Sequence, residues 1–248
     1  GQHVVGINKL KDLLSPLIVK GLKSILIFGV LANPNNKDAK GSKAIDGPTQ
    51  EAISIIKKYF PSLMIVADVC LCAFTNHGHC CIFNENGNID YEQTLYTLGL
   101  ISVSNAKAGV DMIAPSDMMD GRVKAIKVCL EKAGYNLPIM SYSAKFASSF
   151  YGPFRDVCKS APSKGDRKGY QLPPDSKELA LKAVARDLEE GADFVMIKPA
   201  LPYLDIASAI KSKFDCTLAC YHVSGEYAMI EFAARAGALD KKLVHLFV

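Results

Sequence analysis

The sequence predicts an α/β fold and, more specifically, a TIM (β/α)8 barrel. Short apolar runs alternate with longer amphipathic stretches, the runs are continuously apolar, and a polar or reactive residue follows most of them. Continuous β-branched runs are typical of parallel strands that are buried on both faces. The alternation therefore predicts a parallel sheet whose strands are connected through helices by right-handed crossovers.

Six apolar runs are predicted as strands, at residues 24–30, 63–71, 110–116, 137–143, 193–199 and 217–224. Seven amphipathic stretches are predicted as helices, at residues 8–22, 48–60, 91–108, 120–134, 176–190, 204–213 and 225–237. Many of these stretches follow Asp, Ser or Pro and end at Gly, which are common helix boundaries. Two long loops remain, 31–47 and 151–175, and a loop of the second length in a compact domain is usually a lid or disordered.

Six strands fit either an open doubly wound sheet or most of an eight-stranded barrel. The residues at the strand ends favour the barrel, because the carboxyl ends of barrel strands converge on one mouth and those of an open sheet spread along an edge. These residues are Asp68, Ser116, Lys145, Lys198 and Ser224. No sequence repeat or linker-like segment interrupts the chain, so we expect one domain over residues 1–248.

The composition excludes several classes of protein. The chain has 248 residues, a net charge of +4 and no tryptophan, and its basic residues form no stripe, so a nucleic-acid partner is not indicated. No apolar run is long enough to span a membrane, and the first residues do not resemble a signal peptide. Without such a signal, the eight cysteines indicate reduced thiols or metal ligands, and we expect a cytosolic protein.

Half of the cysteines lie in one stretch, "DVCLCAFTNHGHCC", at residues 68–81. Cys70 and Cys72 are two apart at the end of a predicted strand, so their side chains point to the same side. Cys80 returns after a short loop. Three converging thiolates suit zinc and leave its fourth position free for water or substrate, as in a catalytic site.

Other interpretations of this stretch remain open. The thiols could be buried without a ligand, or two of them could form a disulfide. A structural zinc site would usually show a fourth protein ligand and paired Cys-x-x-Cys motifs, which are absent. We expect His77 and His79 to support the site and not to coordinate the metal, and we assign no role to Cys81.

Lys145 and Lys198 each lie at the end of an apolar run. Burial and a second nearby ammonium both lower the pKa of a lysine and expose a nucleophilic amine, which forms a Schiff base with a ketone. The alternative is a lysine paired with a carboxylate at the barrel mouth. Two such lysines on neighbouring strands make the nucleophilic interpretation the stronger one.

These stretches resemble the porphobilinogen synthase family, also called 5-aminolevulinate dehydratase. The motifs are "DVCLC…HGHC", "APSDMMDGR", "MSYSAKFAS-FYGPFRD", "GDRK-YQLPP", "IKPALPYLD" and "YHVSGEY", and the resemblance runs from Gly1 to Val248. It implies a TIM barrel, a homo-octamer and the condensation of two 5-aminolevulinate molecules to porphobilinogen in haem biosynthesis. From this resemblance we expect the chain to be a lyase.

The resemblance also implies residue roles. Lys198 would form the Schiff base with the first substrate and Lys145 with the second. Zn2+ would be held by Cys70, Cys72 and Cys80. The implied substrate contacts are Arg155, Arg167 and Gln171 to the second carboxylate, Asp68 and Ser116 to amino groups, Ser224 to the first carboxylate, and Tyr151 and Tyr221.

The sequence differs from the family pattern at several positions, and these differences limit which family properties we expect here. Gly169 stands where animal members have a further cysteine near the metal, and Leu179 stands where other members place a glutamate for magnesium. Only six of the family's eight strands are expected, with 24–30 matching the second and 217–224 the seventh. We therefore expect part of a longer protein, with an open barrel, poor solubility and little activity alone.

Two other functions compete with this interpretation. A class I aldolase-like barrel needs one Schiff-base lysine and no thiolate metal site, so the three cysteines count against it. A catalytically silent, zinc-stabilised barrel fragment that acts as a binding scaffold is disfavoured by the intact lysines and arginines, Lys145, Lys198, Arg155 and Arg167.

Overall fold

A computed structural model describes residues 3–240 and 242, and it contains all six expected strands. They are β1 (Ser24–Ile27), β2 (Met64–Val69), β3 (Met112–Pro115), β4 (Met140–Lys145), β5 (Phe194–Lys198) and β6 (Thr217–Cys220). They form two three-stranded parallel sheets in the orders β1-β2-β3 and β4-β5-β6. A single parallel bridge between Ile113 and Ile139 joins β3 to the chain just before β4. The α/β prediction is confirmed.

The seven expected helices are also present, at nearly the expected bounds. They are α1 (Leu10–Val19), α2 (Pro48–Tyr59), α3 (Tyr91–Ala108), α4 (Arg122–Lys132), α6 (Lys177–Glu189), α7 (Leu204–Lys213) and α8 (Ser224–Arg235). Asp90 caps α3 by accepting a hydrogen bond from the Gln93 N–H, and Gly109 ends that helix with a left-handed φ of 99°. Such local signals explain why the helix bounds could be predicted.

The prediction of a structureless loop over 151–175 is wrong in its first part. That segment begins with a further helix, α5 (Gly152–Cys158), which has a proline in its first turn. Proline is favoured at this position because its fixed φ suits a helix and its missing N–H would have no partner there. Seven residues are too few for an amphipathic pattern to stand out, so the periodicity missed the helix.

The last strand is shorter than predicted. β6 ends at Cys220, and Ser224 belongs to the first turn of α8. Glu226 explains the early start of the helix, because its buried carboxylate accepts hydrogen bonds from the N–H groups of Val223 and Leu201, each at 2.6 Å. The same carboxylate thereby connects α8 to the chain that follows β5.

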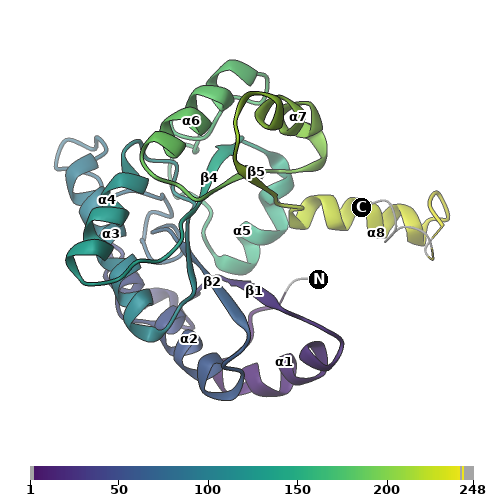
Figure 1. Ribbon diagram of the computed structural model, residues 1–248, viewed down its shortest axis with the longest axis horizontal. Coiled ribbons are helices and arrows are strands. Elements are labelled where there is room, and N and C mark those ends of the chain that lie inside the picture. The colour runs from purple at the N-terminus through teal and green to yellow at the C-terminus, as the bar shows by residue number, and fades with distance from the viewer. Residues whose placement is uncertain (1–2, 241, 243–248) are drawn as a thin grey trace.

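The helices form an arc around the central strands, and this arc is open on the side where α8 projects (Figure 1). Within the described residues, β1 and β6 each pair on one side only, and they do not pair with each other. The expected gap between these two edges is therefore present. The single bridge between the sheets was not expected, since the strands were predicted to form one continuous six-stranded wall.

Three groups of apolar side chains make up the core. One lies between the first sheet and helices α1 to α4, and a second lies between the other sheet and helices α6 and α7. The third is central and is contributed by residues from all six strands: Leu26, Val66, Met112, Ala114, Met140, Tyr142, Phe194, Met196 and Ala219, with Tyr221 just beyond β6. Both faces of the strands are therefore covered, as the continuous apolar runs predicted.

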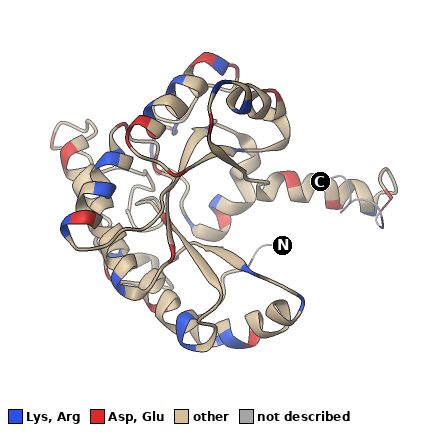
Figure 2. Cartoon of the chain, viewed as in Figure 1, with Lys and Arg blue, Asp and Glu red and all other residues tan. Residues whose placement is uncertain are grey.

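Charged residues of both signs are interspersed along the outer helices (Figure 2). No helix in the described part of the chain is both long and apolar enough to cross a membrane. The charge distribution agrees with the absence of a basic stripe in the sequence.

Candidate active site

The carboxyl ends of β2, β4 and β5 lie around one cavity. Lys145 and Lys198 end two neighbouring strands, and their Cα atoms are in register across the sheet. The cavity is lined by ten of the thirteen predicted site residues: Asp68, Cys70, Cys72, Ser116, Lys145, Tyr151, Arg155, Arg167, Gln171 and Lys198. Of the five strand-end residues expected at one mouth, four line this cavity and Ser224 does not.

Lys198 lies among aromatic rings. Its Nζ is 4.0 Å from the ring centre of Tyr221, 5.2 Å from that of Tyr142 and 5.5 Å from that of Tyr151. The side chain is only 6% exposed. Burial, followed by the charge of Lys145, lowers the pKa of Lys198 to about 7. A substantial share of the Lys198 amine is therefore neutral near neutral pH.

Lys145 is equally buried but has a different environment. Its Nζ donates a short hydrogen bond to the backbone carbonyl of Ser116, in the loop that follows β3. The Nζ also lies 5.6 Å from the ring centre of Tyr142, which is shared with Lys198. One buried tyrosine thus lies beside both amines.

The three predicted zinc ligands are brought together. Their sulfur atoms, from Cys70, Cys72 and Cys80, lie within 4.8 Å of one another, and the Sγ atoms of Cys70 and Cys72 are 3.5 Å apart. Hydrogen bonds from the other two thiols lower the pKa of Cys72 well below its usual range. Cys81, next in sequence, does not join the cluster, and all eight cysteines are unpaired, which excludes the disulfide interpretation in this structure.

The ring nitrogens of the two histidines in this stretch face backbone groups and the Tyr170 hydroxyl, and not the sulfur cluster. His79 Nδ1 is 3.1 Å from the Tyr170 hydroxyl, and His79 Nε2 is 2.9 Å from the Lys164 carbonyl oxygen. His77 Nε2 is 3.3 Å from the carbonyl oxygen of Ala39. Since Lys164 and Tyr170 belong to the 151–175 segment, His79 holds that segment against the cysteine loop.

The 151–175 segment places three polar side chains at the cavity. Arg167 donates hydrogen bonds to the carbonyls of Gly78, at 2.8 Å, and Ser160, while its Nε has no partner among the described residues. Both polar atoms of the buried Gln171 side chain are also unpaired within this part of the chain. Burial and the neighbouring charge of Arg167 lower the pKa of Arg155. These groups can bind an anion.

Two predicted residues lie in an adjoining cavity on the other side of Lys198. Tyr221 and Ser224 line it, together with Tyr151 and Lys198, which are common to both cavities. The Ser224 hydroxyl is buried and has no hydrogen-bond partner in the described chain. Lys198 thus lines two neighbouring pockets, one that includes Cys70 and Cys72 and one that includes the start of α8.

Asp68 lines the same cavity as the two lysines and Cys70 and Cys72. Burial raises its pKa to about 6, against the opposing influence of the Ser116 side chain and of both lysines. Its Oδ1 has no hydrogen-bond partner within the described residues. The carboxylate can therefore accept a hydrogen bond from a bound molecule.

Several site residues had no signal in the sequence. The aromatic residues Phe28, Tyr142 and Phe154 surround Lys198, and the Cys158 thiol lines the same cavity. Phe28 lies in an expected strand and Tyr142 in another, where an aromatic residue indicates only the core. Phe154 and Cys158 lie on α5, the helix that the periodicity missed.

Fold and cavity together define an α/β enzyme whose pocket is lined by two buried lysines and by two thiols of a three-cysteine cluster. The sequence profile of the delta-aminolevulinic acid dehydratase family matches residues 1–246. The chain is 51% identical to the delta-aminolevulinic acid dehydratase of Bos taurus over 248 residues, which cover 98% of this chain and 75% of the bovine protein. It is 45% identical to that of Bacillus subtilis, with 98% of this chain and 75% of the bacterial protein covered.

A solved structure agrees with these relatives. The delta-aminolevulinic acid dehydratase (porphobilinogen synthase) of Toxoplasma gondii, in complex with its reaction product porphobilinogen, superposes with a TM-score of 0.95 at 37% identity. The match covers 99% of this chain and 71% of the parasite protein. The chain belongs to the delta-aminolevulinic acid dehydratase family, whose members are lyases.

Proposed function

We propose that this protein is a porphobilinogen synthase, which condenses two molecules of 5-aminolevulinate to porphobilinogen and releases two molecules of water. One observation carries the proposal: Lys145 and Lys198 end adjacent strands in register, at a cavity that is also lined by Cys70 and Cys72, whose thiols converge with that of Cys80. A reaction between two keto acids needs two amines that can each form an imine, and a pair of lysines in one cavity provides them.

Lys198 is the stronger nucleophile in this proposal. With its pKa near 7, the amine can attack the keto carbon of the first substrate, and water leaves as the imine forms. The surrounding aromatic rings exclude water and favour the neutral amine. Lys145, oriented by the Ser116 carbonyl, forms the second imine beside it.

The polar groups around the lysines hold the other ends of the substrates. Arg155, Arg167 and Gln171 bind the carboxylate of the second substrate, supported by their unpaired nitrogen atoms and by the proximity of two guanidinium groups. Tyr221 and Ser224, in the adjoining cavity, bind the carboxylate of the first substrate.

The amino groups of the substrates have their own partners in this proposal. Asp68 and Ser116 line the cavity together with both lysines, and Asp68 has a free acceptor oxygen within the described chain. Tyr151 contributes its ring beside Lys198 while its hydroxyl donates to the Phe146 and Lys198 carbonyls, at 2.6 and 2.9 Å. It thus supports the wall between the two pockets.

Cys70, Cys72 and Cys80 would hold a zinc ion. The donor set fits, because three sulfur atoms within 4.8 Å match a thiolate zinc site with an open fourth position. A zinc ion at this position supplies a Lewis acid that polarises a bound oxygen or amine. The lowered pKa of Cys72 supports the ligand role, since the thiolate is the coordinating form.

The architecture extends the proposal. The central apolar group receives residues from six parallel strands, as the interior of a TIM barrel does, and the free edges of β1 and β6 leave room for two more strands. We propose that the active form is a homo-octamer in the cytosol that includes segments equivalent to the quarter of the bovine protein outside the match. Exposed edges without those segments favour aggregation of residues 1–248 alone.

A colorimetric pyrrole assay with 5-aminolevulinate, with and without a chelator, tests the function. It is run on residues 1–248 and on the same chain completed with the segments of the bovine relative that it does not match. We expect chelator-sensitive pyrrole formation by the completed protein and little by the shorter one. Failure of the completed, folded protein to form pyrrole would contradict the proposal and favour an aldolase-like barrel or a binding scaffold.

A further inference from the structure

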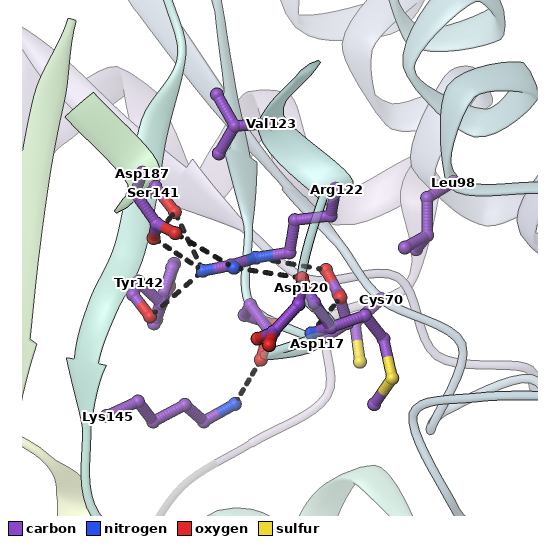
Figure 3. A network of polar contacts seen from close by, with 12 residues as sticks. Cys70, Leu98, Asp117, Asp120, Arg122, Val123, Ser141, Tyr142, Lys145 and Asp187 are labelled. Carbon is purple, nitrogen blue, oxygen red and sulfur yellow. Dashed lines mark hydrogen bonds and ion pairs between the residues drawn. The ribbon is translucent and has the colours of Figure 1, made fainter. Parts of the chain in front are cut away.

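A buried ion-pair network lies next to the cavity. Within the described residues its side chains make no hydrogen bond to the polar side chains that line the cavity, and the two are linked through the backbone. Its centre is Arg122, the first residue of α4, whose side chain is fully buried together with those of Asp117 and Asp187. Figure 3 shows this arginine extending from the loop after β3 toward β4, with Lys145 nearby. A fully buried arginine with two carboxylates is rare and needs an explanation.

One side of the guanidinium is attached to the loop after β3. Arg122 Nη1 donates to the Met119 carbonyl at 3.1 Å, and Arg122 Nε lies 3.6 Å from Asp117 Oδ2. Asp117 Oδ1 in turn accepts a hydrogen bond from the Met119 N–H at 2.8 Å. Between these residues Met118 has a left-handed φ of 72°, which is uncommon for a residue other than glycine and persists only where its surroundings impose it.

The other side of the guanidinium is attached to β4. Arg122 Nη2 donates to the Ser141 hydroxyl at 2.8 Å and to the Tyr142 carbonyl at 3.3 Å. Asp187 on α6 completes the network, since its Oδ2 accepts hydrogen bonds from Arg122 Nη2 at 2.9 Å and from Ser141 at 2.7 Å. The arginine therefore connects the loop after β3, strand β4 and helix α6.

The loop after β3 and strand β4 also provide the acceptor and the donor of one hydrogen bond in the cavity. Ser116, directly before Asp117, provides the carbonyl that accepts from Lys145 Nζ, and Lys145 ends the strand that holds Ser141 and Tyr142. Lys198 lies on β5, to which Arg122 makes no hydrogen bond within the described residues. The network is thus placed to act on one lysine and not on the other.

We infer that Arg122 is a positioning residue that fixes the Ser116 carbonyl relative to Lys145 and so orients the Lys145 amine for its imine. This inference rests on the proposed function, because it assigns a separate support to one of the two lysines. Arg122 itself does not touch the cavity.

Borohydride trapping with 5-aminolevulinate and zinc, followed by peptide mass spectrometry, measures the adducts on Lys145 and Lys198 in one sample. Arg122→Lys keeps the charge but replaces the multidentate guanidinium with a single nitrogen. We expect the Lys145 adduct to fall about tenfold relative to the Lys198 adduct, as for the loss of one charge-assisted hydrogen bond. A general loss of folding would reduce both adducts together.

Two further variants keep the test decisive. Ser141→Ala removes an acceptor on β4 without leaving a charge unpaired, so it decides the matter if Arg122→Lys does not fold; we expect the same direction with a smaller change. Arg186→Lys is the control, because Arg186 also pairs with Asp187, at 2.9 Å, and with Asp120 in the loop after β3, but makes no hydrogen bond to β4 among the described residues. An unchanged ratio of the two adducts in both Arg122→Lys and Ser141→Ala would overturn the inference.

Crystal structures of the same variants separate this inference from the proposed function. If the unmodified protein forms no adduct on either lysine, the proposed function fails, and the structures still decide the positioning role. Displacement of the Ser116 carbonyl beyond hydrogen-bond distance of Lys145 Nζ, roughly 3.5 Å, would support it. An undisturbed hydrogen bond in both variants would overturn it.

Discussion

Lys145 and Lys198 are paired residues on two neighbouring parallel strands, and their Cα atoms are in register. Register partners on adjacent strands project to the same face of a sheet, so both amines enter the same cavity. Each amine has its own hydrogen-bond or aromatic environment, and Tyr142 lies beside both. This arrangement allows two imines to form side by side, which is the geometric requirement for joining two substrates.

Replacing Lys198 by Met should abolish the borohydride-trapped adduct of 5-aminolevulinate at that position. Met keeps most of the apolar stem among the aromatic rings, so the fold should be retained. Adduct formation is measured by peptide mass spectrometry and the fold by circular dichroism. Lys213→Met, on the exposed part of α7, is the control and should trap as the unmodified protein does. An undiminished adduct in the Lys198 variant would assign the nucleophile to another residue.

The same substitution predicts a pH-dependent change in stability. The pKa of Lys198 is about 7 in the folded chain and 10.5 in the reference state, because burial and the Lys145 charge disfavour the ammonium. Between these values the unfolded chain binds more protons, so this residue makes stability rise with pH. Below pH 7 the full cost of burying the ammonium is present, opposed only by Asp68 and the nearby thiols.

Lys198→Met removes this cost, so the variant should melt at a higher temperature than the parent at pH 6, and the difference should shrink steadily toward pH 10. Thermal melts of both proteins across this range provide the measurement. Most other groups are common to both proteins and cancel; Asp68 is an exception, because the charge of Lys198 lowers its pKa. Lys213→Met should show no such trend. A difference that is constant over the range would mean that Lys198 keeps an ordinary pKa in the fold.

Much of this fold could be predicted because its signals are local. The apolar runs located all six strands, and capping residues such as Asp90 and Gly109 fixed the bounds of α3. Lys145 and Lys198 stood out because a lysine at the end of an apolar strand is unusual. The cysteines converge as their spacing predicted, but the expected reason was wrong: β2 ends at Val69, so Cys70 and Cys72 lie in the turn after the strand and not on one of its faces.

What could not be predicted depends on contacts between distant segments. Arg122 reads as an ordinary helix residue until the fold places it against Asp187, which lies 65 positions away. Similarly, His79 contacts the 151–175 segment through Tyr170, 91 residues further on. No pattern in a single sequence records which helix residue meets which strand, so these side chains gained a role only from the structure.

Replacing Cys72 by Ala should remove zinc binding almost completely. The site would retain two sulfur ligands, and a thiolate site with one ligand fewer loses most of its affinity. Metal content after dialysis against zinc provides the measurement, by elemental analysis of the purified variants. Cys81→Ala is the matched control, since Cys81 is buried beside Cys80 but lies outside the cluster. Equal zinc content in both variants would place the metal elsewhere.

Replacing Arg167 by Ala should weaken the second substrate selectively. Arg167 lines the cavity with an unpaired Nε among the described residues, and a guanidinium–carboxylate contact is one of the stronger charge-assisted hydrogen bonds. Its loss should raise the 5-aminolevulinate concentration for half-maximal trapping at Lys145 about ten- to a hundredfold, with little change at Lys198.

The size of this effect distinguishes substrate binding from support of the 151–175 segment, because Arg167 also donates to the carbonyls of Gly78 and Ser160. Arg167→Lys keeps a charge that can meet the carboxylate but lacks the planar guanidinium that binds it through two nitrogens, so it should restore part of the affinity. Lys168→Ala, at an exposed position of the same segment, should leave both half-saturation values unchanged. If Arg167→Ala leaves the value at Lys145 unaltered, Arg167 only supports the 151–175 segment, and the carboxylate is bound by Arg155 and Gln171.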